Sequence, residues 1–214
     1  HTQRRRQRQM CIRDSLTMAP SQFGIFTKSD KRFDTPNIEF HIQPLSLDSF
    51  GKPLHKFPGL TVSVCNLRPL SRGTVSLSSS NPFDKPKIAP NYLSDYEDQQ
   101  VAVESILKAR ELMATNEMAV FEPEEFLPGK NFVKPEELVQ EAGKISTTIF
   151  HPVGTAKMGS YDDPMAVVNE KLKVRGFKNL RVVDGSVMPV ITSGNTHTPI
   201  VMIAEKASEM ILND

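Results

Sequence analysis

The stretch NIEFHIQPL, residues 37–45, decides the fold class. Its apolar side chains at Ile38, Phe40 and Ile42 alternate with polar ones, which is typical of a half-buried β-strand. Two further stretches repeat the alternation, LTVSVCNL (60–67) and GTVSLSS (73–79), and RPLSR joins them. We therefore predict an antiparallel sheet in which these two stretches form a hairpin with a longer loop.

Helical periodicity follows the strand patterns along the chain. In residues 94–116, apolar side chains recur every three to four positions, and Ser94 with Glu97 is a candidate capping box. A short helix is predicted over 135–144, with Pro135 in its first turn. The last helix is predicted from a cap at Thr198. Together with a short strand at 180–184, the pattern predicts an α+β fold with helices on one face of the sheet.

Composition narrows the classes of function. The 214 residues carry 26 Lys+Arg against 25 Asp+Glu, so no overall field attracts nucleic acid or an anionic membrane. No apolar stretch approaches the roughly 18 residues of a membrane span. Cys11 and Cys65 are too few for a disulfide framework, and the histidines form no close pair. We expect a cytoplasmic protein without a metal site, and leave association with a membrane surface open.

The first fifteen residues, HTQRRRQRQMCIRDS, differ from the rest. They are rich in arginine and glutamine and lack an apolar run. The alternative of a basic nucleic-acid arm competes with a resemblance to a translated sequencing adaptor, which we favour. We thus expect a non-native leader at 1–15, followed by a segment at 16–150 and a segment at 151–214.

Two loops hold the residues best suited to chemistry. In TTIFHPVGTAKMG (147–159), His151 precedes Pro152, which restricts the histidine to extended backbone. A partly desolvated imidazole there is a candidate neutral base, although a hydrogen-bonded core histidine is the alternative. In PVITSGNTHTP (189–199), polar residues directly precede a predicted helix, whose N-terminus favours an anion. An ordinary polar capping loop is the alternative for this second stretch.

A third candidate is the pair Asp184-Gly185, which ends the predicted strand at 180–184. Its carboxylate can bind a ligand hydroxyl, or it can hold the turn. A phosphate-binding G-x-G-x-x-G finger is absent from the sequence, because no glycine has another glycine two positions away.

Three motifs in this order, FHPVGTAKMG, LRVVDGSVMP and SGNTHTPIVMIAEKAS, resemble the glucose-methanol-choline (GMC) family of FAD-dependent alcohol oxidoreductases. The upstream stretches CNLRPLSRGTVSLSS and PKIAPNYLS are similar to the family's substrate domain. The resemblance covers about residues 16–214 and is closest to the choline-dehydrogenase-like branch. It implies a substrate-binding domain segment at 16–150, built on an antiparallel sheet. The catalytic loop and the C-terminal FAD-contacting segment follow at 151–214, as a strand-helix piece of an incomplete FAD-binding α/β domain.

The resemblance also implies roles for single residues. His151 matches the family's active-site histidine, and Asn195 matches the second catalytic position, so their two loops are expected to meet. The residues implied as FAD contacts are Asp184, Gly185, Asn195, Thr196 and His197. Related sequences usually carry Asn where His197 stands and Cys where Ala156 stands.

From the resemblance we expect a small alcohol as substrate and FAD as cofactor. Most FAD contacts are expected from an N-terminal part that this sequence lacks, so the isolated chain should neither hold FAD tightly nor turn over. Nucleic acid is not an expected partner. A non-catalytic α+β binding domain, with His151 and Asn195 as buried polar residues, is the alternative.

Overall fold

The computed structural model describes residues 21, 23–48 and 52–214. The leader expected at 1–15 lies outside the described residues. The chain divides into two compact units, each built from two stretches of sequence. The first unit comprises the chain up to Cys65 together with Glu104–Pro123, and the second comprises Asn66–Val103 and Glu124–Asp214.

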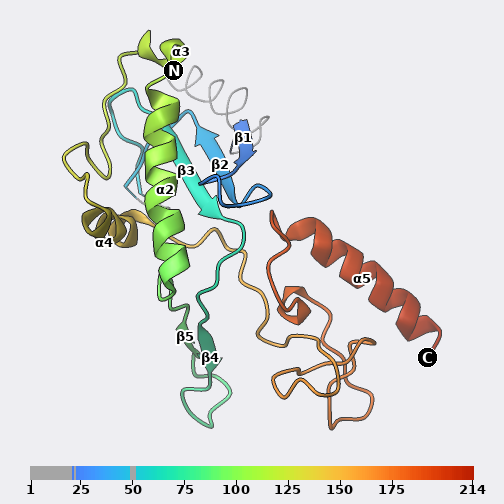
Figure 1. The fold of residues 1–214 in the computed structure, drawn as a ribbon. Coiled ribbons are helices and arrows are strands. Elements are labelled where there is room, and N and C mark those ends of the chain that lie inside the picture. The colour runs from blue at the N-terminus through green and yellow to red at the C-terminus, as the bar shows by residue number, and fades with distance from the viewer. Residues whose placement is uncertain (1–20, 22, 49–51) are drawn as a thin grey trace, which may run out of the picture. The chain divides into compact units, whose positions relative to one another are not determined.

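The first unit contains a three-stranded sheet with the order β1-β2-β3 (Figure 1). Its strands are β1 (Phe23–Thr27), β2 (Ile38–Gln43) and β3 (Thr61–Asn66). β1 and β2 run antiparallel, with Phe23 opposite Ile42 and Thr27 opposite Ile38. The predicted strand at 37–45 is confirmed. Its apolar residues Ile38 and Phe40 are buried, and so is the intervening Glu39, which shows that both faces of β2 are covered at this end.

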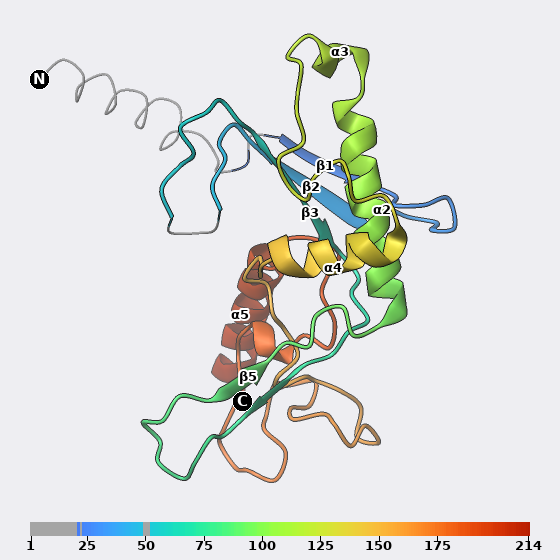
Figure 2. The same ribbon diagram turned by 90° about the vertical axis from the view of Figure 1, so that its left-hand side faces the viewer.

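A polar network fixes the turn between β1 and β2. Asn37 accepts the backbone N–H of Ser29 at 2.8 Å and donates through Nδ2 to the Ser29 hydroxyl. That hydroxyl in turn donates to Glu104 Oε2 at 2.6 Å, and Arg32 forms an ion pair with the same carboxylate. Glu104 lies on helix α2 (Tyr96–Met113), so the network joins the part of α2 within this unit to the sheet beside it (Figure 2).

Helix α2 confirms the helix predicted over 94–116, but its start differs from the expected capping box. Asp95, not Ser94, accepts the backbone N–H of Glu97, at 2.9 Å. The aspartate lies one residue nearer to the helix and satisfies an otherwise unpaired N–H of the first turn. The helix ends at Met113, and the short helix α3 (Asn116–Ala119) follows it.

The predicted hairpin between 60–67 and 73–79 is wrong. β3 pairs within the three-stranded sheet, while β4 (Thr74–Ser76) pairs antiparallel with β5 (Lys87–Ala89). The reason is the buried carboxylate of Asp98 on α2, which accepts the backbone N–H groups of Leu70 and Ser71 and the side-chain amide of Asn66. The loop after β3 is therefore bonded to the helix and does not close a hairpin.

The base of the β4–β5 ribbon contains a close backbone contact at Gly73. A Cβ atom on this glycine would lie 2.3 Å from the carbonyl oxygen of Ala89 and 2.5 Å from that of Pro90. Neither partner is a side chain that could rotate away. The ribbon closes only because residue 73 has no side chain.

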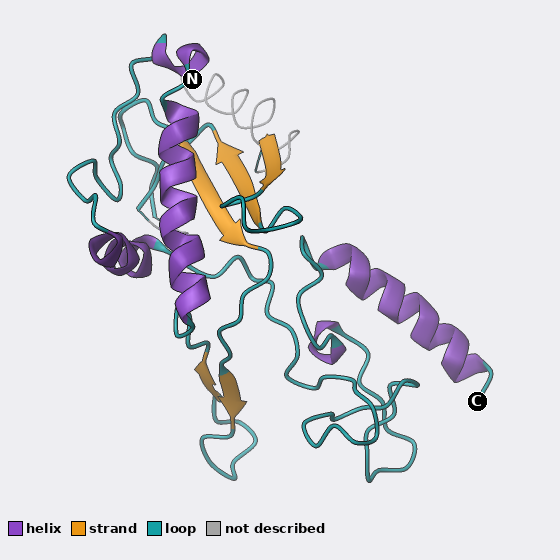
Figure 3. Cartoon of the chain, viewed as in Figure 1, coloured by secondary structure: helices purple, strands orange, loops and turns teal. Residues whose placement is uncertain are grey.

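Helix α4 (Pro135–Ile145) confirms the helix predicted over 135–144, with Pro135 at its start. Most of the chain between α4 and the last helix, α5 (His197–Leu212), is loop (Figure 3). The strand expected at 180–184 forms a single antiparallel bridge, between Lys173 and Arg181. Its partner segment turns at Leu172, which has a φ of 61°, so the ladder does not extend.

A hydrophobic cluster holds these loops against α5. Its buried members are Val168, Leu172, Val187, Met188, Ile203 and Ala207. On α5, Ile203 and Ala207 are buried in this cluster, whereas Val201, Met202, Ile211 and Leu212 are exposed. The outer face of α5 is therefore partly apolar. In the described part of the chain, no helix has the length and apolar character that a bilayer crossing requires.

Candidate active site

His151 lies in the loop that follows α4, within the second unit. The residue before it, Phe150, has a φ of 61°, and its backbone N–H donates to the hydroxyl of Thr148 at 3.0 Å. His151 itself is half-buried, and its imidazole has no hydrogen-bond partner among the described residues. The alternative of a histidine satisfied by core hydrogen bonds is thus not supported. Neither ring nitrogen is hydrogen-bonded to another described residue.

The chain after His151 packs along residues 186–188. Ala156 and Met158 donate their backbone N–H groups to the carbonyls of Ser186 and Val187, at 3.0 and 2.8 Å. Gly154 makes this approach possible, since it has a φ of 86° and its Cβ would lie 3.3 Å from the carbonyl oxygen of Met188. The histidine loop is consequently held against the segment that begins at Asp184.

Arg175 fixes the far end of the same loop. Its guanidinium donates to the carbonyls of Gly159, Ser160, Tyr161 and Asp163. The carboxylate of Asp163 also pairs with Lys157 at 2.8 Å, and the hydrogen bond from this lysine is the main reason why the pKa of Asp163 lies below its usual value. Charge and hydrogen bonding therefore hold the loop in one conformation between Lys157 and Asp163.

Asp184 and Gly185 form a tight turn, which is one of the two roles considered for this pair. Asp184 accepts the backbone N–H of Ser186 at 2.8 Å and so caps the 3₁₀-helix η2 (Gly185–Val187). Gly185 lies against the first turn of α5, because its Cβ would be 3.0 Å from Cδ1 of Ile200. The structure thus brings this turn and the start of α5 together. The carboxylate of Asp184 is exposed.

The three remaining candidates lie at the N-terminus of α5. Asn195 and His197 are exposed, and Thr196 between them is buried. The helix begins at His197 with Thr196 as its N-cap, so the cap predicted at Thr198 is wrong by two residues. The side chain of Thr196 makes no capping hydrogen bond to the helix.

A hydrogen bond that was not predicted from the sequence restrains the loop that carries Asn195. Arg68 donates through Nε to the hydroxyl of Ser193 at 2.9 Å. Ser193 has a φ of 57°, a backbone conformation that side chains other than glycine adopt rarely. Arg68 precedes the loop that Asp98 holds, so the two contacts together join α2 to the Asn195 loop. Nothing in the sequence singles out this arginine.

His151 and Asn195 are both anchored to the hydrophobic cluster of the second unit. Val153, next but one to the histidine, packs against it, as do Val182 and Val183 before Asp184 and Ile200 on α5. Within the described residues no hydrogen bond joins His151 directly to Asn195. Convergence of the two side chains on one ligand therefore stays a prediction, while their supporting segments share one core.

Known proteins share the sequence and the fold of this chain. The model of the GMC oxidoreductase family matches residues 69–204. An alcohol dehydrogenase [acceptor] of Pseudomonas putida is 42% identical over 197 residues, which are 92% of this chain and 35% of that protein. An oxygen-dependent choline dehydrogenase of Vibrio vulnificus is 41% identical, over 88% of this chain and 34% of its own length.

Among solved structures, pyridoxine 4-oxidase from Mesorbium loti superposes with a TM-score of 0.81 at 27% identity. The match covers 91% of this chain and 38% of that one. The chain thus spans about a third of the length of the curated relatives that it matches. From its family match and its identity to these relatives, the chain belongs to the GMC oxidoreductase family.

Proposed function

We propose that the protein to which this chain belongs oxidises a CH–OH donor with FAD as cofactor, His151 as general base and Asn195 as the group that orients the alcohol oxygen. The observation that carries the proposal is the environment of the His151 side chain. This half-buried imidazole has no hydrogen-bond partner among the described residues, and it lies on a loop held from both ends. The family and the names of the relatives supply the reaction class.

The residues at the start of α5 suit the polar groups of FAD. The helix lacks a side-chain cap, and the helix dipole makes its N-terminus favourable for negative charge, by about 0.3–1 kcal/mol at an exposed site. Gly185 keeps the turn beside Ile200 free of bulk. Asp184, Gly185, Asn195, Thr196 and His197 would hold the cofactor. When bound, FAD supplies the acceptor for the hydride that leaves the alcohol carbon.

His151 and Asn195 would act on the alcohol oxygen. A neutral imidazole accepts the hydroxyl proton, and a positioned base of this kind accelerates a reaction by about 10²–10⁴-fold. The Asn195 amide N–H donates to the oxygen as negative charge develops there. Since Asn195 is exposed, its amide is free to turn toward a substrate.

The proposed partners are a small alcohol and FAD, with no role for nucleic acid. Most of the FAD contacts would come from protein outside this sequence, because the chain spans about a third of its relatives and has no G-x-G-x-x-G finger. We also propose that the protein is located in the cytoplasm.

A chimera tests the function. Residues 16–214 of this chain replace the matching third of the Pseudomonas putida relative, and dye-linked oxidation of a panel of small alcohols is measured. His151→Gln should lower kcat by at least about 100-fold with flavin content unchanged. Asn195→Ala should lower kcat/KM. The matched control is His55→Gln, whose imidazole bonds to Ser46 and Asp48 in the first unit and should not matter.

Two outcomes would contradict the proposal. A chimera that folds and binds FAD but keeps full activity after His151→Gln would remove the histidine from the reaction. A folded chimera without flavin would favour the alternative of a non-catalytic binding domain.

A further inference from the structure

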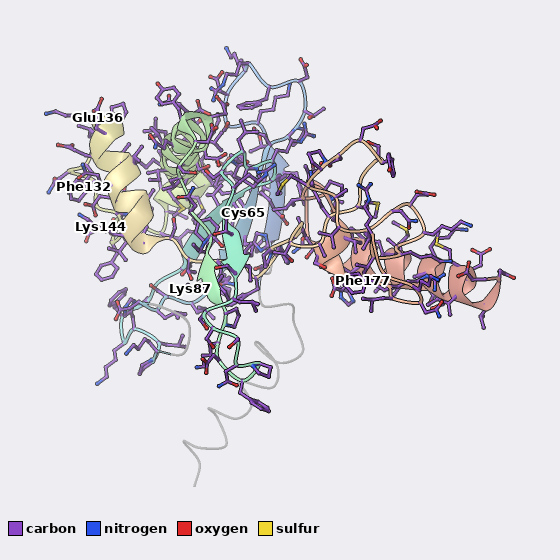
Figure 4. All side chains as sticks on the ribbon, turned by 90° about the horizontal axis from the view of Figure 1, so that it is seen from below. Cys65, Lys87, Phe132, Glu136, Lys144 and Phe177 are labelled. Carbon is purple, nitrogen blue, oxygen red and sulfur yellow. The ribbon has the colours of Figure 1, made fainter. Side chains whose placement is uncertain are left out.

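Three side chains with metal-binding groups meet on the sheet of the first unit. Glu39 and His41 are two residues apart on β2, so both project from the same face of the strand. Cys65 lies on the neighbouring strand β3 (Figure 4). One donor atom from each residue lies within 4.8 Å of the other two. This cluster belongs to the unit that does not contain His151 and Asn195.

The Glu39 carboxylate is removed from water without an adequate cationic partner. Its side chain is only 7% exposed. Two groups lie near this carboxylate. The Cys65 Sγ is 3.9 Å from Oε2, and the His41 Nε2 is 3.1 Å from Oε1. A buried carboxylate is costly unless it is paired and hydrogen-bonded, and a weak thiol donor at 3.9 Å offsets little of that cost.

His41 directs an unused nitrogen to the same place. Its Nδ1 lies 3.3 Å from the hydroxyl of Ser21. Its Nε2 is buried and makes no hydrogen bond, although it lies 3.1 Å from Glu39 Oε1. In the tautomer with the proton on Nδ1, the ring donates to Ser21 and the Nε2 lone pair stays free for a ligand. Histidines that bind metals are commonly oriented in this way, by a hydrogen bond from the other ring nitrogen.

We propose that Glu39, His41 and Cys65 bind one divalent transition-metal ion of the zinc type. Zinc takes thiolate, imidazole and carboxylate ligands at roughly 2.0–2.3 Å, so neighbouring donors in a tetrahedral site are about 3.3–3.7 Å apart. Glu39 Oε1 lies 3.1 Å from His41 Nε2 and Glu39 Oε2 lies 3.9 Å from Cys65 Sγ, so each carboxylate oxygen has one donor near this range. The three donor atoms lie within 4.8 Å of one another. Side-chain rotations that move a donor atom by about 1 Å would bring the widest of these spacings into the tetrahedral range.

The donor set also selects the metal. Sulfur and imidazole ligands favour zinc and similar ions over magnesium and calcium, which prefer oxygen. Three protein ligands leave a fourth position for water. Binding would displace the thiol proton of Cys65. The ion would cross-link β2 to β3 and neutralise the buried carboxylate. The proposal goes beyond the alcohol oxidation above and does not depend on it.

The sequence did not indicate this site, because a search for close histidine pairs passes over it. One histidine and one glutamate lie on one strand, and the cysteine is 26 positions from the glutamate. The rival occupant is a proton on Nε2, which would give an ion pair between His41 and Glu39 with no need for Cys65. The contribution of the cysteine therefore decides between the two.

The test uses the full 214-residue chain, stripped of metal with a chelator and shown by circular dichroism to be folded. Zn²⁺ is titrated by calorimetry, and Co²⁺ by the thiolate-to-cobalt absorption band. We expect one ion per chain, and a higher Tm in excess Zn²⁺. Cys65→Ala should abolish the cobalt band, and Glu39→Gln, which keeps the shape of the side chain, should weaken Zn²⁺ binding by more than about 10-fold.

Matched controls are available in the same chain. Cys11→Ala removes the other cysteine, and His55→Ala removes a histidine that already bonds to Ser46 and Asp48; both should bind the metal like the unaltered chain. Absence of saturable binding to the folded chain would overturn the proposal. So would a cobalt band that survives Cys65→Ala or disappears in Cys11→Ala, and so would unchanged Zn²⁺ affinity in Glu39→Gln.

Discussion

Arg68 and Ser193 are 125 positions apart in the sequence, yet the arginine Nε donates to the serine hydroxyl at 2.9 Å. The serine has left-handed backbone and stands two residues before Asn195. A single side chain thus restrains the loop that carries a proposed catalytic group. Because Arg68 bonds to Ser193 of this loop, we assign it the role of positioning the loop.

Removing this contact should loosen the Asn195 loop. We expect Arg68→Ala to cost about 0.5–1.5 kcal/mol of unfolding free energy and to raise amide hydrogen exchange at Gly194–Thr196. Ser193→Ala should give a similar change, and the double variant should be no worse than either single one. Full additivity in this cycle would show that the hydrogen bond does not contribute.

The carboxylate of Asp98 should contribute substantially to folding stability. It is buried and accepts three hydrogen bonds that hold the loop after β3. Asp98→Asn replaces one acceptor oxygen with a donor facing an N–H group, so urea unfolding should show a loss of about 2–4 kcal/mol. Asp84→Asn, in the exposed β4–β5 loop, is the control and should change stability by less than about 1 kcal/mol. Equal effects of the two variants would argue against this role of Asp98.

The Cys65 thiol should react slowly near neutral pH. Burial and the nearby charge of Glu39 raise the pKa of this thiol to about 11, and the thiolate is the reactive form. In a Cys11→Ala background, the rate of iodoacetamide labelling should therefore rise steeply only as pH passes from 9 toward 11. Glu39→Gln should shift this profile to lower pH. A rate that levels off near pH 8.5 would be inconsistent with the raised pKa.

The same shift has a consequence for stability. The folded pKa of Cys65 lies above the value of 9.0 for an unperturbed cysteine, so the unfolded chain loses its thiol proton first. Stability from the neutral thiol is fully present below pH 9 and is lost as pH rises to about 11. Cys65→Ala should remove this part of the alkaline loss in urea unfolding curves.

The contribution of Asp214 to folding stability should depend on pH in the acid range. Hydrogen bonds from Lys173 and Arg181 lower the pKa of this carboxyl from 3.8 to about 2. A depressed pKa gives stability that is present above pH 3.8 and is lost as pH falls through 2. The urea midpoints of the unaltered chain and of Asp214→Asn should differ at pH 6 and converge near pH 2. A difference that is independent of pH would show that the charge is not involved.

The isolated chain should not retain FAD. It offers the candidate contacts around Asp184 and the start of α5 but has no glycine-rich finger. After incubation with excess FAD, gel filtration should separate the protein from all visible flavin absorbance. Stoichiometric flavin that survives the column would contradict this expectation.

Local patterns predicted the separate elements well. The alternation at 37–45, the periodicity at 94–116 and the proline at 135 each mark an element that the structure contains. These signals are carried by neighbouring residues. The pairing of β3 and β4 was predicted wrongly, because the Asp98 carboxylate that turns the intervening loop lies about 27 residues further along. No local signal reports such a contact.

The candidate site shows the same division. The motifs around His151, Asp184 and Asn195 pointed to these residues, and the structure anchors their segments to one cluster. The link from Arg68 and the exposed state of Asn195 depend on tertiary contacts. The cap of α5 was misplaced for a local reason, since Thr196 and Thr198 are equally good capping residues by type.

Because of Gly73, the base of the β4–β5 ribbon tolerates substitution less well than its far loop. Any other amino acid at position 73 would meet the carbonyls of Ala89 and Pro90, while the far loop, with Ser79 and Asn81 bonded to Asp84, is exposed to solvent. Protein engineers who need to insert a fluorophore tag or an affinity peptide therefore have a permissive position near residues 79–84, provided that the glycine at the base is retained.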